Sequence, residues 1–154
     1  MTDLNDPIWK SLKGGYGELY NASVLLRELE STNDENRIKE IMNQLWSNLY
    51  HQGDVDLVSY FSLPHLIRIG IENKICTYDI LGLVAAIEIA RHSNNPDLPE
   101  EYLESYCEEI QKVTLLICQH SERNWSKEYT VCATAAIAAV NGQIDLAETI
   151  LNTG

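Results

Sequence analysis

Apolar residues recur every three or four positions along most of the chain, and polar or glycine-containing breaks interrupt them. This spacing is typical of amphipathic helices, and no segment shows the sustained alternation of a strand. The clearest stripe follows Asp34, a helix-capping residue, and should end between His51 and Gly53. Its apolar positions are Ile38, Ile41, Met42, Leu45, Trp46 and Leu49. The pattern predicts an all-α protein.

Two shorter elements are expected before this helix. Asp6 and Pro7 favour a helical turn through Trp9, because Asp caps a helix and Pro fits its first turn. After a break at Gly14 and Gly15, the spacing predicts a second helix. The face of this helix would carry Tyr16, Leu19, Tyr20, Ser23, Leu26 and Leu29.

The segment after Gly53 keeps helical spacing but contains a proline. Gly53 should close the preceding helix, and Asp54 is placed to cap the next one. Pro64 cannot donate a backbone hydrogen bond inside a straight helix. We therefore expect a kink or a new helix start at Pro64.

The remaining breaks predict four further helices at most. Thr77 is placed to cap Tyr78–His92, which is apolar nearly all round and is expected to be central. A polar loop then leads to one helix from Glu100 to about His120, and a hairpin of Lys127–Val140, capped by Ser126, and Ile144–Leu151 follows. The expected buried stripe of the Glu100 helix is Leu103, Tyr106, Cys107, Ile110, Val113, Thr114, Ile117 and Cys118.

The length of 154 residues suits one helical domain spanning 1–154. Short Gly, Asn or Asp turns between helices favour antiparallel pairs, and such pairs stack into a HEAT-like α-solenoid. Exact sequence repeats are absent, so an irregular helical bundle remains the alternative. Sequence does not fix the oligomeric state.

Composition narrows the classes of partner. The formal net charge is −12, and no basic patch stands out, which argues against nucleic acid and anionic membranes as partners and favours a basic protein.

The acidic amino terminus lacks the pattern of a secretory signal, so a cytoplasmic location is expected. No apolar run is long enough for a membrane span. The four cysteines show no Cys-x-x-Cys pair and are interpreted as small buried hydrophobes.

The most informative charged segment runs from Asp97 to Glu109, which holds six carboxylates and no lysine or arginine. Glu in a first helical turn suits the helix dipole, but Glu108 and Glu109 lie beyond it. The segment is therefore a solvated face or a docking surface for a basic protein, with Tyr102 as the expected aromatic anchor. A divalent cation site is a third reading, although carboxylates along one helix do not converge on an ion without help. The candidate partner-binding residues are Glu100, Glu101, Tyr102, Glu104, Glu108 and Glu109.

No catalytic or metal site emerges from the motifs. The Gly14–Gly17 segment lacks the strand and the Lys-Ser/Thr that accompany a phosphate-binding loop, so a tight turn is predicted. His51 and His65 have no His-x-x-x-His or Glu-x-x-His pattern around them. We expect no cofactor, no metal and no catalysis. The alternative is a small enzyme that uses His51, Tyr60 and His65 in a cleft.

The stretch Leu-Trp-Ser-Asn-Leu-Tyr-His-Gln-Gly (45–53), followed by Ser59-Tyr60 and Leu63-Pro64-His65-Leu66, resembles a motif in small bacterial proteins of HEAT-like helical repeats. Some of these are similar to immunity proteins encoded beside polymorphic or contact-dependent toxins. The resemblance implies an immunity protein that binds and neutralises a cognate, basic toxin domain. A non-catalytic scaffold or adaptor is the alternative. A second candidate surface comprises Tyr50, His51, Gln52 and Asp54.

Overall fold

A computed structural model describes residues 1–121 and 124–153 of the chain. Its regular elements are helical, and the described residues contain no strand beyond two isolated bridges, Lys13 with Leu19 and His51 with Asp54. The all-α prediction is confirmed. The elements are the 3-10 turn η1 (Pro7–Lys10) and the helices α1 (Ser23–Ser31), α2 (Glu35–Leu49), α3 (Leu57–Glu72), α4 (Tyr78–Arg91), α5 (Glu100–Ile110), α6 (Val113–Cys118), α7 (Lys127–Val140) and α8 (Ile144–Leu151).

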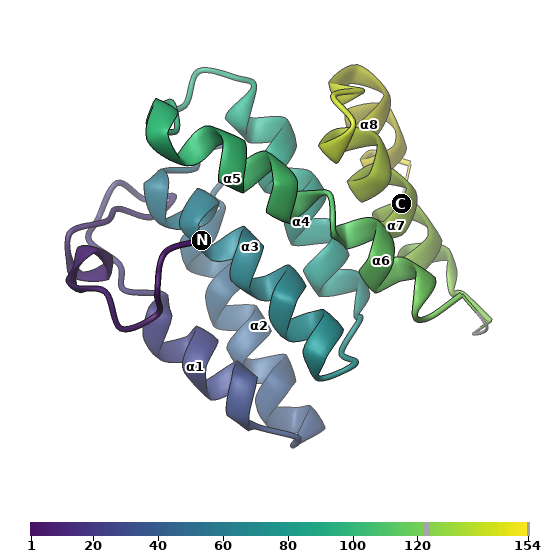
Figure 1. The fold of residues 1–154 in the computed structure, drawn as a ribbon. Helices are drawn as coiled ribbons and strands as arrows, with labels where there is room; N and C mark the ends of the chain where they lie inside the picture. Colours follow the sequence, from purple (N-terminus) through teal and green to yellow (C-terminus); the bar gives the residue numbers. More distant parts are fainter. Residues whose placement is uncertain (122–123, 154) are drawn as a thin grey trace.

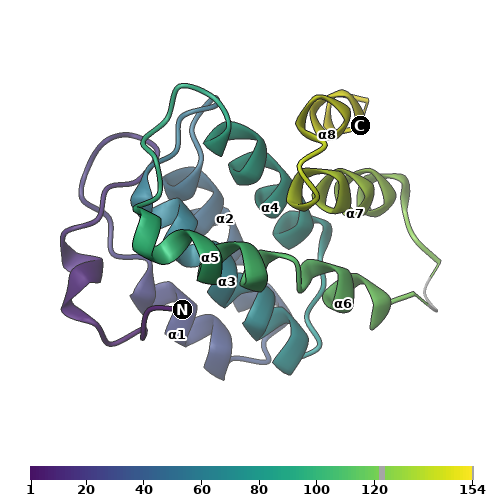
Figure 2. The ribbon, with the colours of Figure 1, turned by 45° about the horizontal axis from the view of Figure 1, so that its top comes forward.

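The helices form two layers (Figures 1 and 2). In one layer α3 contacts α1 on one side and α5 and α6 on the other, and in the second layer α4 lies between α2 and α7. Contacts of α1 with α2, α3 with α4 and α6 with α7 join the layers, while α8 packs on α7 and α4. Neighbouring helices thus pair in chain order, as in a stack of helix pairs.

The core runs through both layers, and its main cluster extends from Leu4 to Val140. In α4, the side chains of Ile80, Val84 and Ile87 are almost fully buried, as expected of a central helix. Helix α3 is equally central, because only its ends and Arg68 lie outside the buried set. It continues through Pro64 without a new start, which corrects the expectation of a restart.

Four predicted caps are present, and the first is Asp6, whose side chain accepts from the Ile8 N–H at the start of η1. The side chains of Asp34, Thr77 and Ser126 each accept a backbone hydrogen bond at the start of α2, α4 and α7. The cap of α3 lies two residues after the predicted position, because Asp56 and not Asp54 caps this helix through a capping box with Ser59.

The predicted second helix begins later than expected. Asn21 Oδ1 accepts hydrogen bonds from the backbone N–H and the hydroxyl of Ser23, and α1 starts there. Before it, Lys13 and Leu19 pair as an isolated bridge, which holds the intervening residues in a loop. Tyr16 and Leu19 are therefore exposed and not helical.

The helix predicted from Glu100 to His120 is in fact two helices. The chain bends at Gln111 and Lys112, where short-range bonds such as Lys112 N–H to Glu109 O replace the α-helical pattern. The bend lets α5 pack on α3 while α6 reaches α7 (Figure 2). Three residues of the predicted buried stripe, Leu103, Thr114 and Cys118, are exposed. Because Cys118 is exposed, the prediction that all four cysteines are buried is wrong.

Candidate functional site

Helix α5 is held in place by a buried polar network. Glu88 on α4 is only 2% exposed, and its carboxylate accepts hydrogen bonds from the Tyr106 hydroxyl (2.8 Å) and from two nitrogens of Arg91 (2.6 and 2.9 Å). The Arg91 guanidinium also lies over the Tyr106 ring, 5.3 Å from its centroid. Burial, and then the negative charge of Glu88, raise the pKa of Tyr106 well above its ordinary value. The phenol therefore stays protonated and donates to Glu88.

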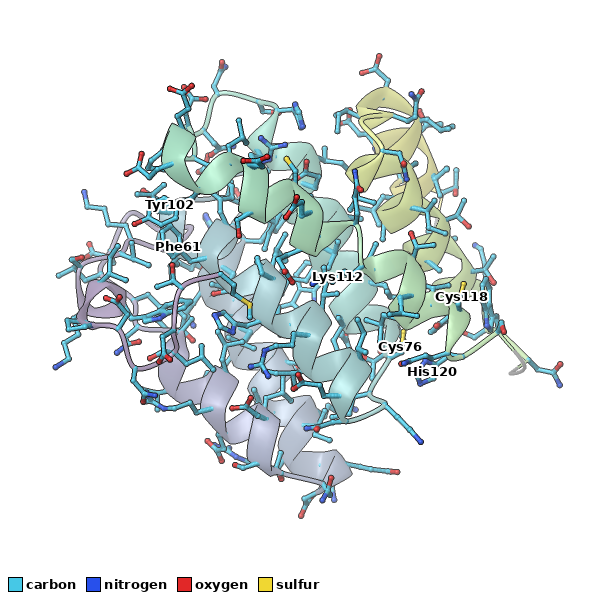
Figure 3. The ribbon with its side chains drawn as sticks, viewed as in Figure 1. Phe61, Cys76, Tyr102, Lys112, Cys118 and His120 are labelled. Carbon is cyan, nitrogen blue, oxygen red and sulfur yellow. The ribbon has the colours of Figure 1, made fainter. Side chains whose placement is uncertain are left out.

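The rotational setting of α5 differs from the predicted one. The ring of Tyr102 packs against Phe61 of α3 with 4.9 Å between centroids, whereas Leu103 is 39% exposed (Figure 3). The inward positions are Tyr102, Tyr106 and Ile110, at intervals of four. Tyr102 is half-buried and is committed to the core, so Leu103 is the apolar side chain available on this surface.

The outward surface of α5 carries the predicted carboxylates. Glu100, Glu101, Glu104 and Glu108 are exposed, and none of the four forms an ion pair with any residue that the structure describes. Glu109 is half-buried and bonds to Lys112 at 2.7 Å. The acidic face of α5, defined as Glu100, Glu101, Glu104 and Glu108 together with Leu103, therefore has carboxylates without an ion-pair partner in the described chain.

Several carboxylates on α1, α2 and α3, in contrast, form ion pairs with arginine. Arg37 bridges Glu28 and Glu40, and hydrogen bonds from Arg37 lower the pKa of Glu28. A second arginine, Arg68, joins α3 to α1 by bridging Glu30 and Glu72. Arg37 and Arg68 thus pair with carboxylates of α1–α3, and Arg91 pairs with the buried Glu88, so none of these three arginines pairs with the exposed carboxylates of α5.

The second predicted surface is a tight turn. His51 and Asp54 exchange both backbone hydrogen bonds, at 3.0 and 2.8 Å, and both central residues have positive φ, 52° at Gln52 and 97° at Gly53. Positive φ at both positions is the signature of a type I′ turn, which favours glycine. Gln52 and Asp54 are exposed at the turn, whereas Tyr50 is half-buried.

This turn lies between two grooves. One, of about 160 Å³, is lined by Tyr50, Gly53, Ala90 and Leu151 among others and separates the turn from α8. The other, of about 450 Å³, lies between the turn and the Gly14–Gly17 loop. The Gly14–Gly17 loop is a tight turn, as predicted, with the Gly17 N–H bonded to Gly14 O at 2.8 Å.

Asn95 links this turn to the loop that precedes α5, and sequence reasoning missed it. Its side-chain oxygen accepts from the Val55 N–H (3.0 Å), and its side-chain amide donates to Gly53 O (2.9 Å) and Ala90 O (2.8 Å). The amino-terminal loops and the first turn of α5 lie at the same end of the molecule (Figures 1 and 2). An asparagine in a polar loop gives no sequence signal for such long-range bonds.

The residues of the alternative enzyme do not meet. His51 borders the groove beside Gly15. His65 is buried, and its Nε2 forms a 2.8 Å hydrogen bond with Thr2 O of the amino-terminal segment. Tyr60 is fully buried, its hydroxyl donates to Pro96 O, and burial raises its pKa to about 12. The three side chains line three different cavities.

Within residues 1–121 and 124–153, no three or more His, Cys, Asp or Glu side chains are grouped so that they could hold a metal ion. In the same residues no helix combines the length and the apolar character that crossing a bilayer requires.

No family model, no curated protein and no solved structure matches this chain.

Proposed function

We propose that this chain is an immunity protein that binds a cognate basic toxin domain through the acidic face of α5 and neutralises it. The observation that supports the proposal most is the set of four exposed carboxylates without ion-pair partners among the described residues. Opposite charge on a partner would accelerate association and orient the encounter. The resemblance of the Leu45–Gly53 segment to proteins similar to immunity proteins supplies the kind of partner.

Exposed apolar side chains near the carboxylates would supply affinity. Leu103 lies among them on α5, and Leu115 on the adjoining α6 is 51% exposed. Binding energy in protein interfaces usually concentrates in a few apolar anchors within a polar rim. In this proposal Leu103 takes the anchoring role first expected of Tyr102, while Tyr102 supports α5 from beneath through Phe61.

The first experiment identifies the partner. Reading frames beside that of this chain are searched for a basic toxin domain, which is then produced in a host with and without this protein while growth is measured. Restored growth supports neutralisation. Binding without restored growth would favour a non-catalytic adaptor, and no binding to a basic domain would contradict the proposal.

The second experiment tests the surface. Charge reversal of Glu101, Glu104 and Glu108 to Lys should lower the association rate at low salt by about tenfold or more and flatten its salt dependence. A matched control reverses the exposed Glu35, Glu128 and Asp145 on α2, α7 and α8, and so changes the net charge equally. Equal effects of the two triple variants would show that net charge, and not the acidic face of α5, governs the encounter.

A further inference from the structure

The larger groove beside the His51–Asp54 turn has an aromatic wall. The ring of Tyr16 is stacked on the ring of His51, with centroids 4.1 Å apart and 33° between their planes. Tyr16 is nevertheless 59% exposed. Stacking on His51 holds the phenol ring in place at the rim, so that binding there would cost little conformational freedom.

Glycines bring the Gly14–Gly17 loop close to the His51–Asp54 turn. A Cβ at Gly15 would lie 2.8 Å from Asp54 O and 2.9 Å from His51 N, and one at Gly14 would collide with Asn48 O. Hydrogen bonds from Gly15 N to Asn48 O (2.9 Å) and from Gly14 N to Glu18 O (2.9 Å) fix this approach. The groove is therefore shaped by backbone contacts that a side chain at either glycine would disturb.

The charge of the groove is negative. Asp54 is exposed and its carboxylate has no ion-pair or hydrogen-bond partner among the described residues, while Asp56 is used in capping α3. Among the residues that the structure describes, no lysine or arginine lines the groove. An electron-rich ring beside a free carboxylate is complementary to a cation, and the planar guanidinium of arginine can contact both at once.

We infer that the groove between the Gly14–Gly17 loop and the His51–Asp54 turn receives an arginine side chain of the partner, stacked on Tyr16 and paired with Asp54. The inference rests on the proposed function for the basic character of that partner. It adds a second contact at the same end of the molecule as the first turn of α5. Asn95 borders the groove and also holds the loop that leads to α5.

The test uses the chain alone, with N-acetyl-arginine amide as the probe and N-acetyl-citrulline amide as its neutral counterpart of similar shape. Backbone amide and Tyr16 ring signals are followed by NMR during each titration. The arginine probe should shift the signals of Gly15, Gly17 and Asp54 saturably, and citrulline should not. Tyr16→Ala should weaken the arginine probe about two- to fivefold, and Asp54→Asn should weaken it by a similar factor.

Other variants separate this inference from the proposed function. The Glu101, Glu104 and Glu108 reversal should leave the groove shifts unchanged, since those side chains lie on α5 and not in the groove. Equal shifts with arginine and citrulline, shifts confined to α5, or unchanged binding by both Tyr16→Ala and Asp54→Asn would overturn the inference. Saturable binding here would stand even if the α5 variant bound the toxin normally.

Discussion

The hydroxyl of Tyr106 on α5 donates a 2.8 Å hydrogen bond to the buried carboxylate of Glu88 on α4. This bond crosses between the two layers, and Arg91 completes the charge balance from the same helix as Glu88. The position of the acidic face of α5 therefore depends on a polar group in the apolar interior.

Removing Glu88 should be strongly destabilising. Glu88→Ala leaves Arg91 and Tyr106 without their acceptor, and loss of one partner of a buried ion pair typically costs about 3–5 kcal/mol. Tyr106→Phe should cost about 1–3 kcal/mol, because it removes one buried donor and leaves the ion pair. Urea unfolding measures both. The exposed Glu101→Ala serves as the control and should change stability by less than about 0.5 kcal/mol.

Sequence reasoning succeeded where a helix has a clean break on both sides. The start of α2 follows from Asp34, that of α4 from Thr77 and that of α7 from Ser126, because a capping side chain acts on amides within three residues of itself. These are local effects. They are readable from one sequence without knowledge of the fold.

Sequence reasoning failed where contacts between distant segments determine the local structure. Leu103 and Tyr102 are adjacent and both are large, so contacts with other helices, such as that of Tyr102 with Phe61 on α3, determine which one turns inward. Tyr16 and Leu19 fit a helical stripe, yet the pairing of Lys13 with Leu19 and the contact of Gly15 with α2 hold them in a loop. For the candidate site, the carboxylates could be predicted from sequence, whereas the anchor and the groove could not.

The setting of α5 is tested by a pair of neighbouring substitutions. Tyr102→Ala should destabilise the protein by about 1–3 kcal/mol through lost packing on Phe61. Leu103→Ala should have an effect below about 0.5 kcal/mol, since its side chain faces solvent. Unfolding free energies that rank the two variants in the opposite order would mean that α5 is rotated as first predicted from the sequence.

Acidification should lower the free energy of unfolding through protonation of His65. Burial lowers the pKa of His65 below its ordinary value, and the buried Nδ1 has no hydrogen-bond partner among the residues described. The unfolded chain thus binds this proton more readily than the folded one. The stabilising contribution is complete above the unfolded pKa of about 6.5 and is lost as pH falls below it through the folded pKa.

The measurement compares unfolding free energies near neutral pH and at about pH 5 in the parent and in His65→Gln. The parent should lose more stability on acidification than the variant. An NMR titration of the His65 ring in the folded parent provides an independent check. A ring that titrates at or above its ordinary value would contradict the prediction.

Asn95→Ala should loosen the end of the molecule that carries both candidate surfaces. It removes three hydrogen bonds to backbone groups, each worth about 0.5–1.5 kcal/mol, so a loss of about 2–3 kcal/mol is expected. Hydrogen exchange at the Val55 amide should accelerate. Asn94→Ala, at the exposed neighbouring position, is the matched control and should leave that exchange rate unchanged.

Within residues 1–121 and 124–153, Glu100, Glu101, Glu104 and Glu108 form no ion pair, and this also bears on how such a protein can diversify. Substitutions at these positions leave the arginine–glutamate pairs and the core side chains of the described chain untouched. Under the proposed function, mutation at these positions would therefore change recognition of the partner while the scaffold is kept. A library randomised at these four positions and at Leu103 should consist largely of folded variants.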